Sequence, residues 1–282
     1  MNKGYIKIVL FLLSILVYVD NETLATELVP EENTTPELTD LSLTSEEINE
    51  KKEDILCTDP KETKEAIELM NEAVKHLEIH ATDMHKYMLC RSDRFSDTTL
   101  YKKKLENNTD VEKVEYSVYG LDKHNEIINE IWNPDHPNPF NNGDVKIVRV
   151  YNPNLVIIQQ RYKKKTGSPQ KYFYALATKV QISENTTIIA YTSANINDHN
   201  PSKKKYENKI IQKANSFKIN INSEEDIRKG KLKKTFVNLA GYHIQNQRNG
   251  ANITYIESID GHTSIKPRCL LGRCYNSYYL NI

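Results

Sequence analysis

The run YFYALATKV, residues 172–180, constrains the fold more than any other part of the sequence. Successive side chains of an extended strand point to opposite faces of a sheet. One face of this strand would carry Tyr172, Tyr174, Leu176 and Val180, and the other Phe173, Ala175 and Ala177. A sheet with one solvated face alternates apolar and polar residues more cleanly. Both faces of this strand must therefore be covered, by a helix, a second sheet or an apolar ligand.

Strands of the same kind lie on either side of this run. The segments VKIVRVY, NLVIIQQRYK, NTTIIAYTSANI, KTFVNLAGYHIQNQ and NITYIESID are rich in β-branched and aromatic residues and are separated by turn residues. This pattern predicts an antiparallel meander of six strands from residue 145 to residue 260. Three shorter strands are expected before it, in YMLCR, TTLYKKKL and VEKVEYSVYG.

Two helices are expected before the meander. Apolar residues recur at intervals of three and four residues between positions 60 and 82, which is typical of an amphipathic helix, at Ala66, Ile67, Met70, Ala73, Val74 and Leu77. Asp59 followed by Pro60 supplies an N-cap and a first helical residue. The segment HNEIINEIWNP, residues 124–134, predicts a short second helix, and Pro134, Pro137 and Pro139 predict an irregular loop after it.

The N-terminus has the pattern of a secretory signal peptide. Lys3 and Lys7 precede an apolar stretch at 8–19, which is shorter than the about 20 residues that span a bilayer. Thr23, Leu24 and Ala25 predict cleavage after Ala25, with an uncleaved signal anchor as the alternative. Residues 26–55 are acidic and rich in Thr and Pro, which predicts a disordered linker. No later segment is apolar enough to cross a membrane, so we expect a secreted, soluble chain.

Secretion places the four cysteines in an oxidising compartment. We expect a disulfide between Cys57 and Cys90, which flank the first helix and would contribute on the order of 3–4 kcal/mol. The other two pairings of the four cysteines stay open, because sequence alone does not fix connectivity. Cys269 and Cys274 have no matching second pair, which makes a zinc site a weak interpretation.

Charge and motifs argue against several function classes. Lys+Arg and Asp+Glu both number 38, so the net charge gives no reason to expect a nucleic acid as partner. His76 and His80 have a metal-ligand spacing, but no third ligand follows from the pattern, and we expect no metal and no cofactor. Ser258, Asp260 and His262 are adjacent only in sequence, which carries little weight for a catalytic triad. We therefore expect no enzyme and no catalytic residues.

Lysine runs at 163–165, 203–205 and 229–234 have two interpretations. Such runs are usually solvated loops, and the alternative is that they contact an anionic membrane leaflet transiently.

Four phrases of the sequence resemble one family. VYNPNLVIIQQRYKKKTGSPQKYFYALATKVQI, SANINDHNPSKKKYENKIIQKANSFKINI, DIRKGKLKK and YIESIDGHTSI are similar to the fam-a proteins of rodent malaria parasites (Plasmodium), as is the leader IKIVLFLLSILVYVDNETLATE. The resemblance extends from Met1 to about Ile265. Fam-a proteins are similar to START (StAR-related lipid transfer) domains, which implies an α+β helix-grip fold: a curved antiparallel sheet around a C-terminal helix, enclosing a lipid tunnel.

The resemblance also implies a function, a site and a location. The function would be binding or transfer of a phospholipid of the phosphatidylcholine type, and the partners a phospholipid in an apolar tunnel and a transiently contacted membrane surface. The site residues would be Tyr162, Lys171, Tyr174 and Ser264. Lys171 would meet the lipid phosphate, and the simpler alternative is an ordinary solvated lysine at the end of a strand. Secretion would lead to the parasitophorous vacuole or the host erythrocyte.

The C-terminal segment departs from the family pattern. START domains enter their last helix through Ile-Pro-x-Trp-Leu, whereas this chain continues from Ile265 with KPRCLLGRCYNSYYLNI. Pro267 and Gly272 interrupt a helix there, so we expect the domain to span 56–265 and residues 266–282 to form a divergent tail. The grip helix would be missing or shortened, and an apolar sheet face would be left partly uncovered. An alternative function follows: a secreted interaction protein or antigen that uses the same scaffold without transferring lipid.

Overall fold

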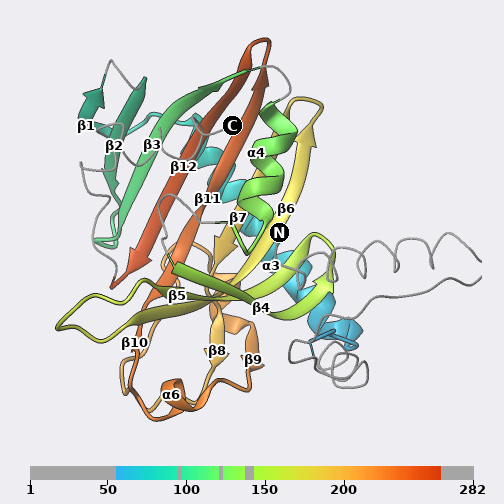
Figure 1. Ribbon diagram of the computed structural model, residues 1–282, viewed down its shortest axis with the longest axis vertical. Coiled ribbons are helices and arrows are strands. Elements are labelled where there is room, and N and C mark those ends of the chain that lie inside the picture. The colour runs from blue at the N-terminus through green and yellow to red at the C-terminus, as the bar shows by residue number, and fades with distance from the viewer. Residues whose placement is uncertain (1–54, 94–96, 121–122, 137–142, 262–282) are drawn as a thin grey trace, which may run out of the picture. The chain divides into compact units, whose positions relative to one another are not determined.

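Within the described residues, which are 55–93, 97–120, 123–136 and 143–261, ten strands form one sheet (Figure 1). In the computed structural model, the described residues from Cys57 onward belong to one compact unit. The expected signal peptide and nearly all of the expected linker lie outside the described residues, as do Ser264 and the predicted 266–282 tail. The predictions for these segments stay predictions.

Neighbouring strands along the main path of the sheet are antiparallel throughout. In spatial order its strands are β1 (Met88–Asp93), β2 (Thr98–Lys104), β3 (Asp110–Tyr119), β12 (Gly250–Asp260), β11 (Phe236–Gln247), β7 (Thr186–Thr192), β6 (Lys171–Ser183), β5 (Leu155–Tyr162) and β4 (Gly143–Asn152). The short β10 (Lys233–Lys234) pairs with β6 in parallel, off this path. The six-stranded meander from β4 to β12 is thus confirmed, and the three early strands extend it at the β12 edge.

Helix α3 (Pro60–Thr82) covers one face of the sheet. Its start confirms the predicted cap, because a side-chain oxygen of Asp59 accepts a hydrogen bond from the Lys61 N–H at 2.8 Å. Its apolar stripe is buried against β6, β7, β11 and β12, except for Ile67, which was predicted to belong to the stripe but is 40% exposed. Gly241 in β11 makes this contact possible, since a Cβ there would lie 2.5 Å from Leu77 Cδ1 and 2.1 Å from the Ile189 carbonyl oxygen.

Helix α4 (Lys123–Trp132) lies on the opposite face, against β11 and β12, and Figure 1 shows it in front of the sheet while α3 passes behind. Ile127 and Ile128 pack there with Tyr242 and Tyr255. Strand β6 lies between the two layers: Tyr172, Tyr174 and Leu176 belong to the α3-side core, and Phe173, Ala175 and Ala177 are buried on the other face. The predicted covering of both faces of β6 is confirmed.

The segment 193–235 was predicted incorrectly. The run NTTIIAYTSANI does not form one strand, because β7 ends at Thr192 and the chain leaves the sheet. The segment then forms β8 (Asn195–Asn197), α5 (Lys213–Ser216), β9 (Lys218–Asn220) and α6 (Glu225–Arg228), with β8 and β9 paired in parallel. The buried Asn208 amide donates hydrogen bonds to the Ser193 carbonyl oxygen and to Thr192 Oγ1, which fixes the departure point.

The predicted Cys57–Cys90 disulfide is contradicted by the structure, in which both are free thiols. Cys57 lies before the first turn of α3, where its N–H bonds the Val150 carbonyl oxygen. Cys90 lies in β1, past the other end of a 23-residue helix. At 1.5 Å per residue this helix separates its ends by about 35 Å, whereas bridged cysteines need Cα atoms within about 7 Å.

One buried histidine ties the end of α3 to the sheet. His80 is 7% exposed, and its Nδ1 lies 2.9 Å from Tyr87 Oη. Burial lowers the pKa of His80 to about 4, and the neighbouring charges of Lys103, His76 and Lys113 add to this, against a weaker opposite effect of Asp83. Lys113, itself buried, caps the helix by donating to the Ala81 carbonyl oxygen at 2.7 Å.

We predict that stability falls with acidification because His80 must be neutral in the folded chain. A native pKa below the unfolded value of about 6.5 means that the unfolded chain binds more protons between these two pH values. The free energy of unfolding should therefore decrease from about pH 6.5 down to about pH 4. Chemical denaturation across this range should show His80→Gln losing about 3 kcal/mol less than the parent. Equal losses in the two proteins would contradict the assignment.

We also predict that Gly241→Ala destabilises the chain far more than Gly167→Ala. Both glycines have positive φ, so both substitutions introduce backbone strain of about 1 kcal/mol. Only at Gly241 does the added Cβ also collide with a helix and a neighbouring strand, whereas at Gly167 nothing lies within 4 Å. Thermal denaturation should show at least about 2 kcal/mol of additional loss for Gly241→Ala. Similar losses would mean that α3 does not rest on this position.

Candidate functional site

The sheet face that carries α4, here called the α4 face, has an apolar centre. On β6 it presents Phe173, Ala175 and Ala177, and on β5 it presents Val156, Ile158 and Gln160. These positions follow from the alternation, because their neighbours Leu155, Ile157, Tyr172, Tyr174 and Leu176 belong to the α3-side core. The two alanines leave the middle of β6 with very little side-chain volume on this face.

One end of the α4 face is polar. Strand β5 ends at Tyr162 where β6 begins at Lys171, and the register of Arg161 with Tyr172 brings these two strand ends side by side. The Tyr162 ring packs edge-on against Phe173 with centroids 5.8 Å apart, so Tyr162 lies on the α4 face. Burial, and then the charge of Glu257, raises the pKa of Tyr162. Lys171 Nζ donates to the Gly261 carbonyl oxygen at 2.6 Å.

Two buried carboxylates share this end of the face. Glu257 on β12 is directly opposite Glu112 on β3, and their side chains are 4% and 7% exposed. Tyr255, which is in the core with α4, donates its hydroxyl to Glu257 Oε2 at 2.8 Å. Lys102 Nζ lies 3.7 Å from Glu112 Oε1. The end therefore combines carboxylate, phenol and ammonium groups around aromatic rings.

The opposite end of the α4 face carries another cation. Lys179 Nζ lies 5.6 Å from the centroid of the Trp132 ring of α4, and burial lowers the pKa of Lys179. Eight residues of β6 separate Lys171 from Lys179, which corresponds to about 26 Å at 3.3 Å per residue. The α4 face is thus a long apolar strip with polar groups at each end. The described side chains of the strip on β5 and β6 are buried, with exposed fractions of 0–7%.

The four predicted site residues do not all lie together in the structure. The fold brings Tyr162 and Lys171 together, and it places Tyr174 on the opposite face, where Gln159 Nε2 donates to the Tyr174 hydroxyl. Ser264 lies outside the described residues. Sequence reasoning missed Glu112, Tyr255 and Glu257. Their spacing was a usable signal, since a buried tyrosine and a glutamate two residues later share one face of a strand.

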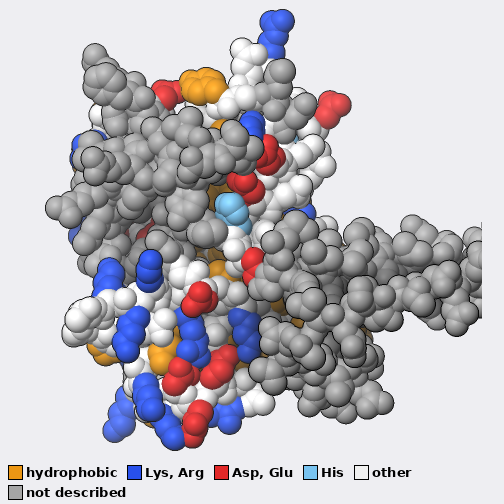
Figure 2. Space-filling model, in the orientation of Figure 1, with side chains coloured by type: hydrophobic (Ala, Val, Ile, Leu, Met, Phe, Trp, Pro, Cys, Tyr) orange, Lys and Arg blue, Asp and Glu red, His pale blue; other side chains and the backbone are white. Residues whose placement is uncertain are grey.

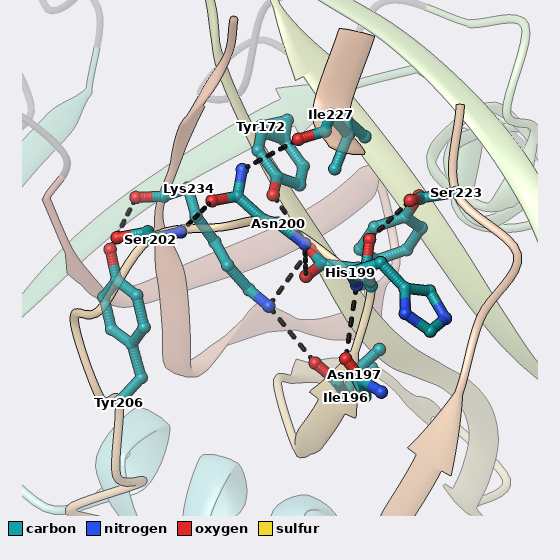
Figure 3. A network of polar contacts seen from close by, with 12 residues as sticks. Tyr172, Ile196, Asn197, His199, Asn200, Ser202, Tyr206, Ser223, Ile227 and Lys234 are labelled. Carbon is teal, nitrogen blue, oxygen red and sulfur yellow. Dashed lines mark hydrogen bonds and ion pairs between the residues drawn. The ribbon is translucent and has the colours of Figure 1, made fainter. Parts of the chain in front are cut away.

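A second polar cluster is centred on Asp198, which contacts Tyr172 of the α3-side core, and Figure 3 shows its neighbours Tyr172, Ser223 and Lys234. Asp198 is 3% exposed, and its Oδ2 accepts a hydrogen bond from the Tyr172 hydroxyl at 2.8 Å and lies 3.0 Å from Lys234 Nζ. Ser223 Oγ donates to the Asp198 carbonyl oxygen. Lys234 Nζ also donates to the Ile196 carbonyl oxygen at 3.2 Å. These groups satisfy one another's hydrogen bonds and charges. The cluster therefore fixes the segment 193–235, which includes β10, to β6.

Neither the Asp198 cluster nor the histidines form a reactive arrangement among the described residues. His199 follows Asp198, but its side chain is exposed and its backbone N–H is the group that bonds Asn197. Asp260 accepts a hydrogen bond from Asn238 Nδ2 at 3.0 Å, and His262 lies outside the described residues. No group of three or more His, Cys, Asp or Glu side chains in the described ranges is arranged to hold a metal ion. In the same ranges, no helix combines the length and the apolarity needed to cross a bilayer.

Comparison with known proteins identifies the fold. No model of a known protein family matches the chain, and no curated protein matches it by sequence. Among solved structures it is similar to human STARD10, with a TM-score of 0.50, 10% identity, and coverage of 73% of this chain and 72% of that chain. It is also similar to human StAR-related lipid transfer protein 5, with a TM-score of 0.50, 13% identity, and coverage of 78% and 95%. The predicted START-like fold, a curved antiparallel sheet with an N-terminal helix, is confirmed.

We predict that Asp198→Asn destabilises the chain by about 3 kcal/mol. The substitution would leave the Lys234 ammonium, which is 17% exposed, without its carboxylate partner. The matched control is Glu106→Gln, which removes an exposed partner of Lys86 and should cause no measurable change. Denaturant titrations of the three proteins measure the difference. If Asp198→Asn is as stable as Glu106→Gln, the Asp198 cluster does not fix the segment.

Proposed function

We propose that the chain is a START-type lipid-binding protein that holds a phospholipid along the α4 face and transfers it between membranes. The observation that supports this most directly is the apolar strip of β6, which carries small side chains on one face although the strand is buried on both. One leaflet of a bilayer has about 15 Å of hydrocarbon, half of the about 30 Å core. A strip of about 26 Å therefore has room for an extended acyl chain and a headgroup.

The polar end of the strip supports a phosphatidylcholine-type headgroup. A quaternary ammonium is held by aromatic faces and by nearby negative charge, and Tyr162, Phe173 and Tyr255 stand beside Glu257 at this end. The phosphate of the same headgroup needs a cation, and Lys171 is the one on the adjacent strand end. Tyr174 has no part in this site, because its side chain points to the other face of the sheet.

Membership of the fam-a family, secretion, and export to the parasitophorous vacuole or host erythrocyte are part of the same proposal, and so is the absence of enzymatic activity. Their support is the sequence resemblance and the signal-peptide pattern. The competing function, a secreted interaction protein that transfers no lipid, is an outcome of the test below.

The test is transfer of a fluorescent phosphatidylcholine from donor to acceptor vesicles, together with stability measurements on two variants. We predict that Ala175→Phe stops transfer and leaves stability nearly unchanged, because the new ring occupies space meant for an acyl chain. Ala190→Phe is the matched control: Ala190 is equally buried, on β7, but it faces the core with α3. There the added ring should cost about 1–3 kcal/mol or more of stability.

Two results would contradict the proposed function. The first is no transfer by the parent protein, with no phospholipid recovered from it by extraction, which would favour the interaction protein. The second is that Ala175→Phe destabilises the chain as much as Ala190→Phe, since this would indicate that protein side chains already fill the α4 face.

A further inference from the structure

The fold brings three lysine runs that are far apart in the sequence to one end of the molecule. The exposed members of this group, here called the basic end, are Lys163, Lys164, Lys165, Lys203, Lys204, Lys205, Lys229, Lys231 and Lys233. Figure 2 shows Lys and Arg side chains over the lower end of the molecule, with Asp and Glu side chains interspersed among them, where Figure 1 places β10 and α6. From the sequence these runs had two interpretations, solvated loops or transient contact with an anionic membrane leaflet, and their proximity was not predicted.

Contacts between the loops establish that the runs are neighbours. Lys233 in β10 pairs with Lys171 at the start of β6, directly after the turn that carries 163–165. Burial lowers the pKa of Lys171, and repulsion from Lys233 and from Lys165 lowers it further. The Tyr206 hydroxyl donates to the Lys234 carbonyl oxygen at 2.6 Å, which attaches the 203–205 run to β10. A Cβ on Gly230 would lie 3.0 Å from Pro201 Cγ, so the 201 and 230 loops also touch.

The positive charge of the basic end is largely uncompensated within the described part of the chain. Lys229 forms an ion pair with Glu225 at 2.5 Å, and the other eight lysines have no carboxylate within ion-pair distance among the described residues. Two of the nearby acids are committed elsewhere, since Glu224 pairs with Lys146 and Arg161, and Asp226 with Arg161, whereas Glu207 is exposed beside the 203–205 run. Because the whole chain has a formal net charge of zero, this end is a local concentration of positive charge that attracts anions.

Two features favour a membrane over a nucleic acid. The exposed cations of the three runs are lysines, which act as point charges, and the arginine beside them, Arg228, donates to Asn222 Oδ1, whereas arginine is the usual residue for bidentate nucleic-acid phosphate recognition. The aromatic ring at this end does not offer a free stacking surface, since Tyr206 stacks on Phe236 with centroids 5.4 Å apart and carries Lys204 Nζ over it at 4.5 Å. Clusters of four to eight basic residues typically bind anionic phospholipid surfaces.

We propose that the basic end docks the protein on an anionic phospholipid leaflet. The docked face includes the strand ends that carry Tyr162 and Lys171, so docking presents the polar end of the α4 face to the membrane. The role of docking in lipid transfer rests on the proposed function. The attraction to the leaflet does not, because it depends on charge alone. Docking should weaken with salt, as expected for a surface charge interaction.

The test measures binding of the purified protein to vesicles of phosphatidylcholine alone and of phosphatidylcholine with about one third phosphatidylserine. One lysine from each run is neutralised in the variant Lys164→Gln/Lys203→Gln/Lys231→Gln. Its control neutralises three exposed lysines from other parts of the chain, Lys64→Gln/Lys75→Gln/Lys104→Gln. The parent and the control should bind anionic vesicles equally, and the three-run variant should bind them about 100-fold more weakly. All three proteins should bind neutral vesicles weakly.

Three results would overturn docking by the basic end: equal binding to neutral and anionic vesicles, an equal loss in the control, or tighter binding to a DNA or RNA duplex than to anionic vesicles at the same salt. Lipid extraction of the same samples separates this proposal from the proposed function. If the protein binds anionic vesicles through these lysines but carries and transfers no phospholipid, the docking surface is supported and the proposed lipid site is contradicted.

Discussion

Burial of strand β6 on both faces is the constraint on which the rest of the structure depends. Seven consecutive residues, from Tyr172 to Thr178, are buried, so neither face can be left to water. The α3 layer covers one face with large side chains, and the approach of the helix requires a glycine at position 241. The other face carries Phe173 and two alanines. This asymmetry, with large groups on one side and two alanines on the other, is the basis of our proposal that the α3 side is structural and the α4 face binds lipid.

Polar contacts on the α3 side of the sheet hold the segment 193–235 against β6. Asp198, Tyr172 and Lys234 fix the 193–235 segment against β6 from the α3 side. The same contacts hold β10 beside the start of β6, and therefore bring Lys233 next to Lys171. A buried carboxylate on the structural face thus determines where the lysines of the basic end lie. Loss of the Asp198 pair would disturb the docking surface although none of its residues belongs to it.

Local pattern in the sequence was enough to predict the main elements. The stripe from Ala66 to Leu77 and the Asp59–Pro60 start predicted α3, and the alternation in 172–180 predicted a strand covered twice. Interactions between distant segments were not predictable in this way. In the parallel pairs β8–β9 and β10–β6, the strands β8, β9 and β10 have only two or three residues each, too few to show a periodicity in the sequence. The register that places Glu257 opposite Glu112 is a property of the folded sheet. The Cys57–Cys90 prediction failed because sequence proximity ignores the length of the intervening helix.

The central claim is that one face of β6 meets lipid and the other does not. Photocrosslinking with a phosphatidylcholine that carries a photoreactive acyl chain tests this directly, when the labelled protein is digested and the adducts are located by mass spectrometry. We expect adducts on the α4 face, at Phe173, Ala175 or Ala177. Adducts at Tyr172, Tyr174 or Leu176, or none above the level given by a non-lipid photoreactive probe, would contradict it.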